Sequence, residues 1–154
     1  MQINIKKLHP NAKEPTYGSE GAGCFDLHAA TVDGYEHIGM IVTNDSPVVC
    51  GTGLSFEIPH GQTMLIFSRS GHGFNSAVRL SNCVGVIDSD YRGEVKVKLT
   101  CDDLSEEIPP LRINPGDRIA QALLVPSCRV TFNFAEELTD TARGAGGFGS
   151  TGSK

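Results

Sequence analysis

One stretch of the sequence, LSNCVGVIDSDYRGEVKVKL (Leu80–Leu99), concentrates side chains that can do chemistry. Asp88 follows the apolar pair Val86–Ile87, and a carboxylate held beside apolar walls is suited to act as a general base. Asn82 carries an amide that both donates and accepts hydrogen bonds, as contact with a nucleobase edge requires. Tyr91 offers a flat face to a sugar or a base. The same letters also fit a β-hairpin, because DSDYRG has the composition of a tight turn.

Two further stretches carry groups that bind anions. In SRSGHG, after the apolar run TMLIF, Arg69, Ser70 and Gly71 provide a guanidinium, a hydroxyl and an unhindered N–H. Together they suit a phosphate or an oxyanion, although this tripeptide alone more often forms a polar turn. His72, which follows it, is only a weak candidate for the same site. Gln121 stands between two alanines in an apolar run, where a polar residue is either edge-facing or functional.

Asp26 lies in GAGCFDLHAA, among apolar and small residues. A buried aspartate must be hydrogen-bonded, paired with a cation or near a metal. The five histidines do not have the spacing of metal ligands.

The glycine-rich stretch RGAGGFGSTGSK (Arg143–Lys154) matches G-x-G-x-x-G. A dinucleotide fingerprint must follow a strand and open a helix, and no helix follows this one. A Walker loop is excluded as well, because Gly-Lys-Ser/Thr is missing. Glycine-rich backbone can still present N–H groups to an anion, with a guanidinium from Arg143 and hydroxyls from Ser150 and Thr151. Taken alone, such a stretch more often forms a disordered terminus.

The elements that must position these groups are mostly strands. In Glu94–Thr100, valines and a leucine alternate with Lys96 and Lys98, which predicts a half-buried strand. The run Arg118–Pro126 fits a buried strand or a short helix, and its flanking prolines and the following run CRVTFNF favour strands. Turn residues recur about every ten positions, so we expect an all-β sandwich, barrel or jelly roll without long helices. The hydrophobic pattern stops near Thr139, which divides a domain of residues 1–138 from an arm of residues 139–154.

Length and composition exclude several classes. A chain of 154 residues fits one domain, and a net charge of −5 argues against a broad nucleic-acid surface. No apolar run reaches the length of a membrane span, and no signal core is present at the N-terminus, so we expect a cytoplasmic protein with no membrane partner. Five scattered cysteines without C-x-x-C predict buried, reduced thiols that pack as small hydrophobes.

Taken together and in order, these stretches resemble the trimeric deoxyuridine triphosphatases (dUTPases). The five motifs of that family have counterparts in GCFDLHA, SRSG, NCVGVIDSDYRG, PGDRIAQ and RGAGGFGSTG, which run from Gly23 to Gly152. The resemblance implies a single-domain, jelly-roll-like β fold and a homotrimer whose flexible C-terminal arm closes over a neighbour's active site. It also implies hydrolysis of dUTP to dUMP and pyrophosphate, which keeps uracil out of DNA and supplies dUMP.

The resemblance also assigns roles. Asp88 matches the general base that activates water for in-line attack on the α-phosphorus, and Asp26 matches the acidic residue that supports Mg²⁺ through water. Phosphate contacts fall to Arg69, Ser70, Gly71 and Gln121. The uracil pocket consists of Asn82 with the backbone of Gly85, Val86, Ile87 and Lys96, and Tyr91 packs against the deoxyribose. The fifth motif supplies Arg143, Phe148, Gly149, Ser150 and Thr151: the phenylalanine stacks on uracil, and the arginine and hydroxyls contact the terminal phosphates.

Each site in the family draws on three subunits: the first, second and fourth motifs come from one, the third from another and the fifth from the third. Three features depart from the family pattern, the first being Ser68, where Pro is common in the second motif. Gly23, Cys24 and Phe25 precede Asp26 where the family has Ala-Gly-x, and GHGFNS follows the second motif in place of a more apolar stretch. Two alternatives remain: a dCTP deaminase-like enzyme on the same fold, and a nucleotide-responsive binding or signalling trimer.

Overall fold

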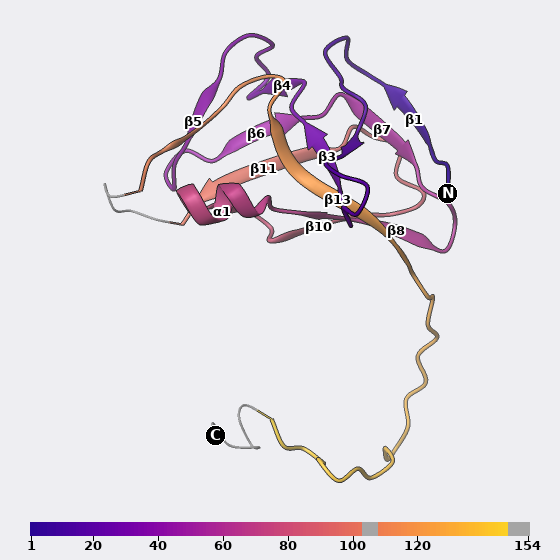
Figure 1. The fold of residues 1–154 in the computed structure, drawn as a ribbon. Coiled ribbons are helices and arrows are strands. Elements are labelled where there is room, and N and C mark those ends of the chain that lie inside the picture. The colour runs from indigo at the N-terminus through magenta and orange to yellow at the C-terminus, as the bar shows by residue number, and fades with distance from the viewer. Residues whose placement is uncertain (103–107, 148–154) are drawn as a thin grey trace.

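The computed structural model describes residues 1–102 and 108–147, and within them the chain is almost entirely β (Figure 1). Among the described residues, one short helix, α1, interrupts the strands. The elements in chain order are β1 (Asn4–Lys7), β2 (Thr16–Tyr17), β3 (Phe25–His28), β4 (Thr31–Val32), β5 (Met40–Val42), β6 (Val48–Gly51), β7 (Leu54–Glu57), β8 (Gln62–Phe67), α1 (Ser70–Ser76), β9 (Val78–Leu80), β10 (Val84–Ile87), β11 (Lys96–Cys101), β12 (Leu111–Ile113) and β13 (Arg118–Pro126).

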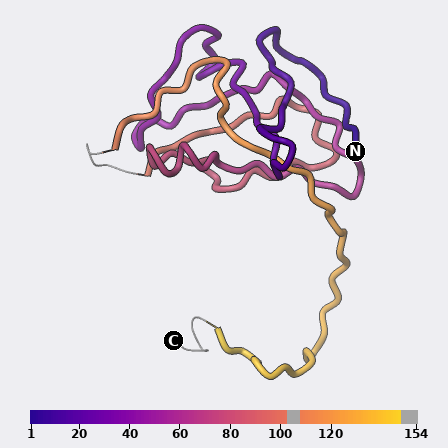
Figure 2. The backbone as a smooth tube through the Cα atoms, viewed as in Figure 1, coloured from indigo at the N-terminus to yellow at the C-terminus, as the bar shows by residue number. Residues whose placement is uncertain are grey.

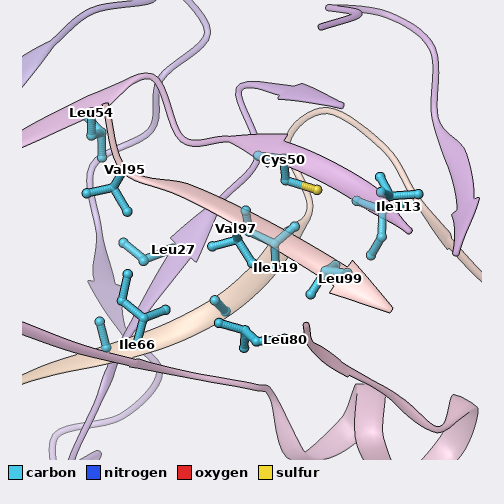
Figure 3. Packing of buried hydrophobic residues seen from close by; sticks show 14 of the residues in the cluster. Leu27, Cys50, Leu54, Ile66, Leu80, Val95, Val97, Leu99, Ile113 and Ile119 are labelled. Atoms are coloured by element: carbon cyan, nitrogen blue, oxygen red, sulfur yellow. The ribbon is translucent and has the colours of Figure 1, made fainter. Parts of the chain in front are cut away.

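Two larger sheets enclose the core. The five-stranded sheet has the order β10-β8-β13-β3-β2, and the four-stranded sheet has the order β4-β6-β11-β9. The pairs β1-β7 and β12-β5 complete the fold, and the strand pairings are antiparallel. The buried cluster unites both larger sheets, because Val97 and Leu99 of β11 belong to it with Ile66 of β8 and Ile119 of β13 (Figure 3). The expected all-β architecture is confirmed.

The two central strands follow their sequence patterns. In β11, Val97 and Leu99 are buried while Lys96 and Lys98 are exposed, as the alternation predicts. The run Arg118–Pro126 forms one strand, β13, which pairs with β3 on one side and β8 on the other. The helical alternative for this run is therefore excluded. Because β13 lies inside the sheet, it joins the strands that carry the first and second motifs.

The helix α1 was not expected from the sequence, which suggests a polar turn at SRSGHG. Arg69 is its N-cap in an extended conformation (φ −82°, ψ 134°), and Ala77 ends it in the left-handed region, where its N–H donates to the carbonyls of His72 and Gly73. Two glycines lower the intrinsic helix propensity of this segment. The helix packs against β9, so tertiary contacts rather than propensity favour it.

The stretch from β10 to β11 is not a hairpin, so that interpretation is wrong. β10 pairs with β8 in one sheet, whereas β11 pairs with β6 and β9 in the other. The segment DSDYRG is a turn, as predicted, but it carries the chain from one sheet to the other. The two strands therefore diverge, and this divergence opens space between them.

The chain leaves the body of the fold after β13 (Figures 1 and 2). The N–H of Ser127 still donates to the carbonyl of Gly61 at 2.8 Å, and residues 128–134, expected to be a strand, form none in this single chain. Val130, Phe132 and Phe134 are exposed at 65%, 89% and 102%. Among the described residues of the same chain, nothing therefore covers these large apolar side chains.

None of the five cysteines, all of which lie in the described residues, forms a disulfide, and they are not all buried. Cys50 is in the core, where burial raises the pKa of its thiol to about 12. Cys83 and Cys128 are exposed, so the prediction of buried thiols is wrong for these two. Their segments lie at a turn and beyond the last strand, where the hydrophobicity of a cysteine does not imply burial. Over the described residues, no helix has the length and apolar character needed to cross a membrane.

Candidate functional site

A charged cluster forms where β3, β8 and β13 lie side by side. Gln121 of β13 is opposite Asp26 of β3 and also opposite Phe67 of β8. The Oδ1 atom of Asp26 lies 3.5 Å from Nε of Arg69, and its Oδ2 lies 3.1 Å from Nη1 of Arg118. The Asp26 side chain is only 14% exposed, so two guanidinium groups satisfy a largely buried carboxylate. The sheet register thus unites the predicted residues of the first, second and fourth motifs.

Arg69 is held from several sides. Its Nη1 lies 3.1 Å from Nε2 of His72 and donates to the carbonyl of Arg118 at 3.4 Å, in addition to the Asp26 contact at Nε. Gln121 donates through Nε2 to the carbonyl of Ser68 at 3.1 Å, so it fixes the start of the same turn. Two guanidinium groups face one carboxylate, which leaves the cluster cationic and suited to an anion. Ser70 and Gly71, at the start of α1, are exposed beside it.

Two histidines near this cluster are kept neutral. Burial, and then the charge of Arg69, lowers the pKa of His72, with Arg118 acting in the same direction and Asp117 against it. Burial, and then Lys13, lowers the pKa of His28. Both Nδ1 atoms are buried without a hydrogen-bond partner among the described residues.

A groove runs between the diverging strands β10 and β11. One cavity in it, of about 360 Å³, is lined by Asn82, Gly85, Val86, Ile87 and Lys96 with Ile66, Leu80, Ser81, Val97 and Lys98. An adjoining cavity of about 450 Å³ is lined by Asp88, Tyr91, Glu94 and Val95, and shares Val86, Ile87 and Lys96 with the first. These volumes fall in the range of about 300–1,000 Å³ that is typical of small-molecule sites. The groove therefore contains the predicted third-motif residues.

The lack of a side chain at Gly85 helps to shape this groove. Gly85 lies opposite Ile66 of β8, and a Cβ at position 85 would lie 3.1 Å from the Cβ of Ile66. A contact this short requires the neighbouring side chain to move. Glycine therefore lets the backbone of β10 form the wall of the cavity directly, so its N–H and C=O groups lie close to any ligand there.

Backbone hydrogen bonds fix the turn that carries Asp88. The N–H of Tyr91 donates to the carbonyl of Asp88 at 3.2 Å, and the Tyr91 hydroxyl donates to the carbonyl of Glu94 at 3.0 Å. Arg92 bonds to the carbonyls of Ser89 and Tyr91, and the hydroxyl of Ser55 donates to the carbonyl of Arg92 at 2.8 Å. Asp88 itself is exposed at the edge of the groove. Its carboxylate therefore has a fixed backbone and open access to solvent.

Asp88, in the second cavity of the groove, lies far from the charged cluster within one chain. Ile87 pairs with Met64, whereas Val84 pairs with Phe67, two residues before Arg69. Asp88 therefore lies at the end of β8 opposite to the end that carries Arg69. Met64 and Arg69 are five residues apart, which corresponds to roughly 16 Å along a strand. The predicted base and the predicted phosphate-binding residues are thus separated in a single protomer.

The fifth motif is described only in part. Arg143 is exposed, its Nε donates to the carbonyl of Gly146 at 2.8 Å, and Gly144 has a φ of +51°. Phe148, Gly149, Ser150 and Thr151 lie outside the described residues. The described chain that follows β13, which includes Arg143, extends away from the body of the fold (Figure 2).

Two residues of the cluster were not assigned a role from the sequence: Arg118 and His72. Arg118 stands at the start of an apolar run, and only the pairing of β13 with β3 places it at Asp26. His72 follows the SRSG motif and gave only a weak signal in the sequence. The structure shows that α1 places its ring within hydrogen-bonding distance of Arg69. A larger cavity, of about 610 Å³, contains none of the predicted site residues; it is lined mainly by apolar side chains that include Ile3, Phe56 and Leu123.

Comparison with known proteins gives a consistent result. The model of the dUTPase family matches residues 10–152. The chain is 41% identical over 152 residues to a deoxyuridine 5'-triphosphate nucleotidohydrolase of Nautilia profundicola, covering 99% of each protein. Among solved structures, a dUTPase of Staphylococcus bacteriophage 80alpha with dUpNHpp aligns with a TM-score of 0.81 at 23% identity, covering 98% of each chain. A mutant dUTPase from phage phi11 of S. aureus, described with a structural Mg(II) ion, aligns with a TM-score of 0.73 at 22% identity, covering 89% of this chain and 98% of that one.

Proposed function

Because the chain belongs to the dUTPase family, its reaction is the hydrolysis of dUTP, and we propose that Asp88 is the general base of that reaction. The observation that carries this proposal is the groove between β10 and β11. It combines the exposed carboxylate of Asp88 with a cavity whose size and lining suit a nucleobase. Asp88 takes a proton from a water molecule as the water oxygen attacks the α-phosphorus. The bond from the α-phosphorus to the bridging oxygen breaks, and dUMP and pyrophosphate form.

We propose that the groove reads the base and the sugar. Asn82 and the backbone of Gly85, Val86, Ile87 and Lys96 contact the uracil edge, since main-chain donors and acceptors at fixed positions distinguish uracil from cytosine. A narrow wall leaves no room for the methyl group of thymine. Tyr91 packs against the deoxyribose, where its ring excludes a 2′-hydroxyl.

The charged cluster is proposed to hold the triphosphate. Arg69, Ser70, Gly71 and Gln121 contact phosphate oxygens, and the cationic character of the cluster supports this role. Guanidinium groups bind phosphate through paired, charge-assisted hydrogen bonds. Holding the phosphates in place supplies most of the catalysis in phosphoryl chemistry.

Mg²⁺ is the proposed cofactor. Among the described residues, no group of three or more His, Cys, Asp and Glu side chains is placed to hold a metal. Both oxygens of Asp26 face arginines, which fits an ion that keeps its water ligands and is held mainly by substrate phosphates. Asp26 is therefore proposed to support Mg²⁺ through water. The bound ion would neutralise charge on the triphosphate.

We propose a homotrimer with composite sites. The roughly 16 Å between the ends of β8 means that one chain cannot bring its own Asp88 to its own Arg69. Exposed apolar residues after β13 and the large apolar cavity support contacts between copies. The arm, residues 139–154, then supplies Arg143, Phe148, Gly149, Ser150 and Thr151 to a neighbour's site. The five cysteines without a disulfide support a reducing, cytoplasmic location.

Complementation between inactive variants tests the composite site. Asp88→Asn and Arg69→Ala chains are each expected to be inactive, and mixed trimers regain activity because some sites combine an intact Asp88 with an intact Arg69. Random exchange gives about a quarter of the wild-type activity. No recovery after denaturation and joint refolding contradicts shared sites, and sedimentation of each variant confirms that it assembles.

Substrate competition separates the enzyme from its alternatives. Pyrophosphate release is measured with dUTP, dCTP, dTTP and UTP, and only dUTP is expected to turn over well. Equal turnover of the four contradicts the proposed selectivity. Ammonia release from dCTP favours a deaminase, and tight binding of dUTP without turnover favours a signalling trimer.

A further inference from the structure

His72 lies in the first turn of α1, where its ring contacts the proposed phosphate-binding Arg69. Arg69 is the N-cap of α1, and His72 follows three residues later, so the helix brings the two side chains together. The distance from His72 Nε2 to Arg69 Nη1 is 3.1 Å. The sequence departs from the family pattern at this point, where GHGFNS replaces a more apolar stretch. An imidazole at this position therefore adds an interaction that an apolar residue cannot make.

The contact fixes the protonation of the ring. An arginine side chain remains charged and can only donate, so Nε2 of His72 must accept and carry no proton. The proton of the neutral ring then sits on Nδ1, which is buried and has no partner among the described residues. An unpaired buried donor is costly, and this cost calls for an explanation in function.

We propose that His72 is a positioning residue for the triphosphate. Its neutral ring accepts a hydrogen bond from Nη1 of Arg69 and holds the guanidinium against the start of α1. Within the described residues, Asp26 contacts Nε, and His72 and the carbonyl of Arg118 contact Nη1, while no hydrogen bond reaches Nη2. Nη2 is thus presented to a phosphate oxygen. This inference rests on the proposed role of Arg69 in dUTP binding.

Protonation of His72 would reverse this arrangement. The charged groups near the ring are Arg69 on the same segment, Asp117 just before β13 and Arg118 at the start of β13. β9 also packs against α1, and its charged residue, Arg79, is paired with Asp102. Burial and the two arginines lower the pKa of His72, so the ring is neutral at pH 7. At acid pH a protonated ring can no longer accept, and its charge repels the guanidinium.

Three variants test the proposal. His72→Leu removes the acceptor but keeps an apolar side chain, His72→Gln keeps a neutral acceptor that does not titrate, and Asn75→Ala is a matched control on the same helix. Affinity for α,β-imido-dUTP is measured by calorimetry between pH 5 and pH 8, with kcat and KM for dUTP and with thermal unfolding of each variant.

At pH 7.5, His72→Leu is expected to bind the analogue about tenfold more weakly, as loss of one charged hydrogen bond implies, with kcat little changed. We expect His72→Gln to retain wild-type affinity at pH 7.5. The affinity of the wild type should decrease below about pH 6.5, the ordinary pKa of histidine, and that of His72→Gln should not. Nitrogen NMR of the imidazole shows the proton on Nδ1. In an Arg69→Ala background, His72→Leu causes no further loss.

Each result can also overturn the inference. Unchanged affinity in His72→Leu, parallel pH profiles of His72→Gln and wild type, or additive losses with Arg69→Ala contradict it. A proton on Nε2 contradicts it without any activity measurement, and so remains decisive if a variant folds poorly. If the wild type does not release pyrophosphate from dUTP, the proposed function fails instead; if it does and His72→Leu behaves as wild type, only the role of His72 fails.

Discussion

At the scale of single residues, the pairing of Asp26 illustrates why its surroundings matter more than its own chemistry. The sequence indicates only that an aspartate among apolar neighbours needs a partner. The structure provides two: Arg69, the N-cap of α1, and Arg118, the first residue of β13. A carboxylate in this setting organises two guanidinium groups, which favours triphosphate binding as much as metal support. The same residue can therefore serve both roles through its neighbours.

The base assignment makes a direct prediction. Asp88→Asn removes the proton acceptor but leaves the shape of the groove, because the turn is held by backbone carbonyls and by Tyr91 and Ser55. Turnover should fall by about 10²–10⁴, the usual contribution of a general base. Affinity for a non-hydrolysable dUTP analogue should stay within a few-fold. Pyrophosphate release and calorimetry measure the two quantities, and an active variant refutes the assignment.

The neutral histidines predict a pH dependence of stability. The pKa values of His28 and His72 are lowered in the fold. Below about pH 6.5 the unfolded chain binds protons at these rings while the folded chain does not, so the free energy of unfolding decreases as pH falls through this window. Urea denaturation at constant protein concentration measures it. His72→Gln should remove part of the slope, and an unchanged slope argues against a lowered pKa at His72.

At the scale of elements, strands with strong patterns were predictable and segments that depend on distant partners were not. Alternation at Val95, Val97 and Leu99 predicted β11, because burial of one face is encoded locally. The helix α1 was missed because its two glycines oppose a helix, and packing on β9 decides its formation. The supposed hairpin failed for a related reason: a turn sequence specifies a change of direction but not which strands pair.

The same limit applies to the candidate site. The motifs indicated the chemistry of Asp88, Asn82 and Arg69, since residue type and order carry that information. Arg118 and His72 could not be assigned, because their roles depend on the register of β13 against β3 and on the first turns of α1. Residues that act through other side chains can be recognised only from the three-dimensional arrangement of the strands and the helix.

The turn before β11 gives a prediction at this scale. A Cβ at Gly93 would lie 2.6 Å from Cζ of Tyr91, so Gly93→Ala must displace the tyrosine ring. If the ring excludes a 2′-hydroxyl, the ratio of kcat/KM for dUTP over UTP should fall several-fold. Gly18→Ala is the control, because no atom lies within 4 Å of its added Cβ. An unchanged ratio in Gly93→Ala would remove Tyr91 from sugar selection.

At the scale of the whole molecule, one chain forms a packed β-sandwich but does not bring the proposed site residues together. The core joins both sheets, yet Asp88 and the charged cluster lie at opposite ends of β8. Residues 128–134 extend away from the body of the fold (Figures 1 and 2), and Phe132 and Phe134 are exposed. Monomeric soluble proteins rarely expose large apolar side chains that are so close together in the sequence. Association of copies accounts for both features at once, since it covers apolar surface and brings the two half-sites together.

Assembly through residues 128–134 is therefore expected to control activity. Phe132→Ser with Phe134→Ser removes apolar surface without touching the folded body, so the single chain should keep its β circular dichroism. Sedimentation should show a shift from the proposed trimer toward monomer, and dUTP turnover should fall in parallel if the sites are shared between subunits as proposed. Removal of residues 139–154 is the matched control: we expect the trimer to persist while turnover falls through loss of the arm. A double-serine variant that stays trimeric and active would show that this segment does not hold the copies together.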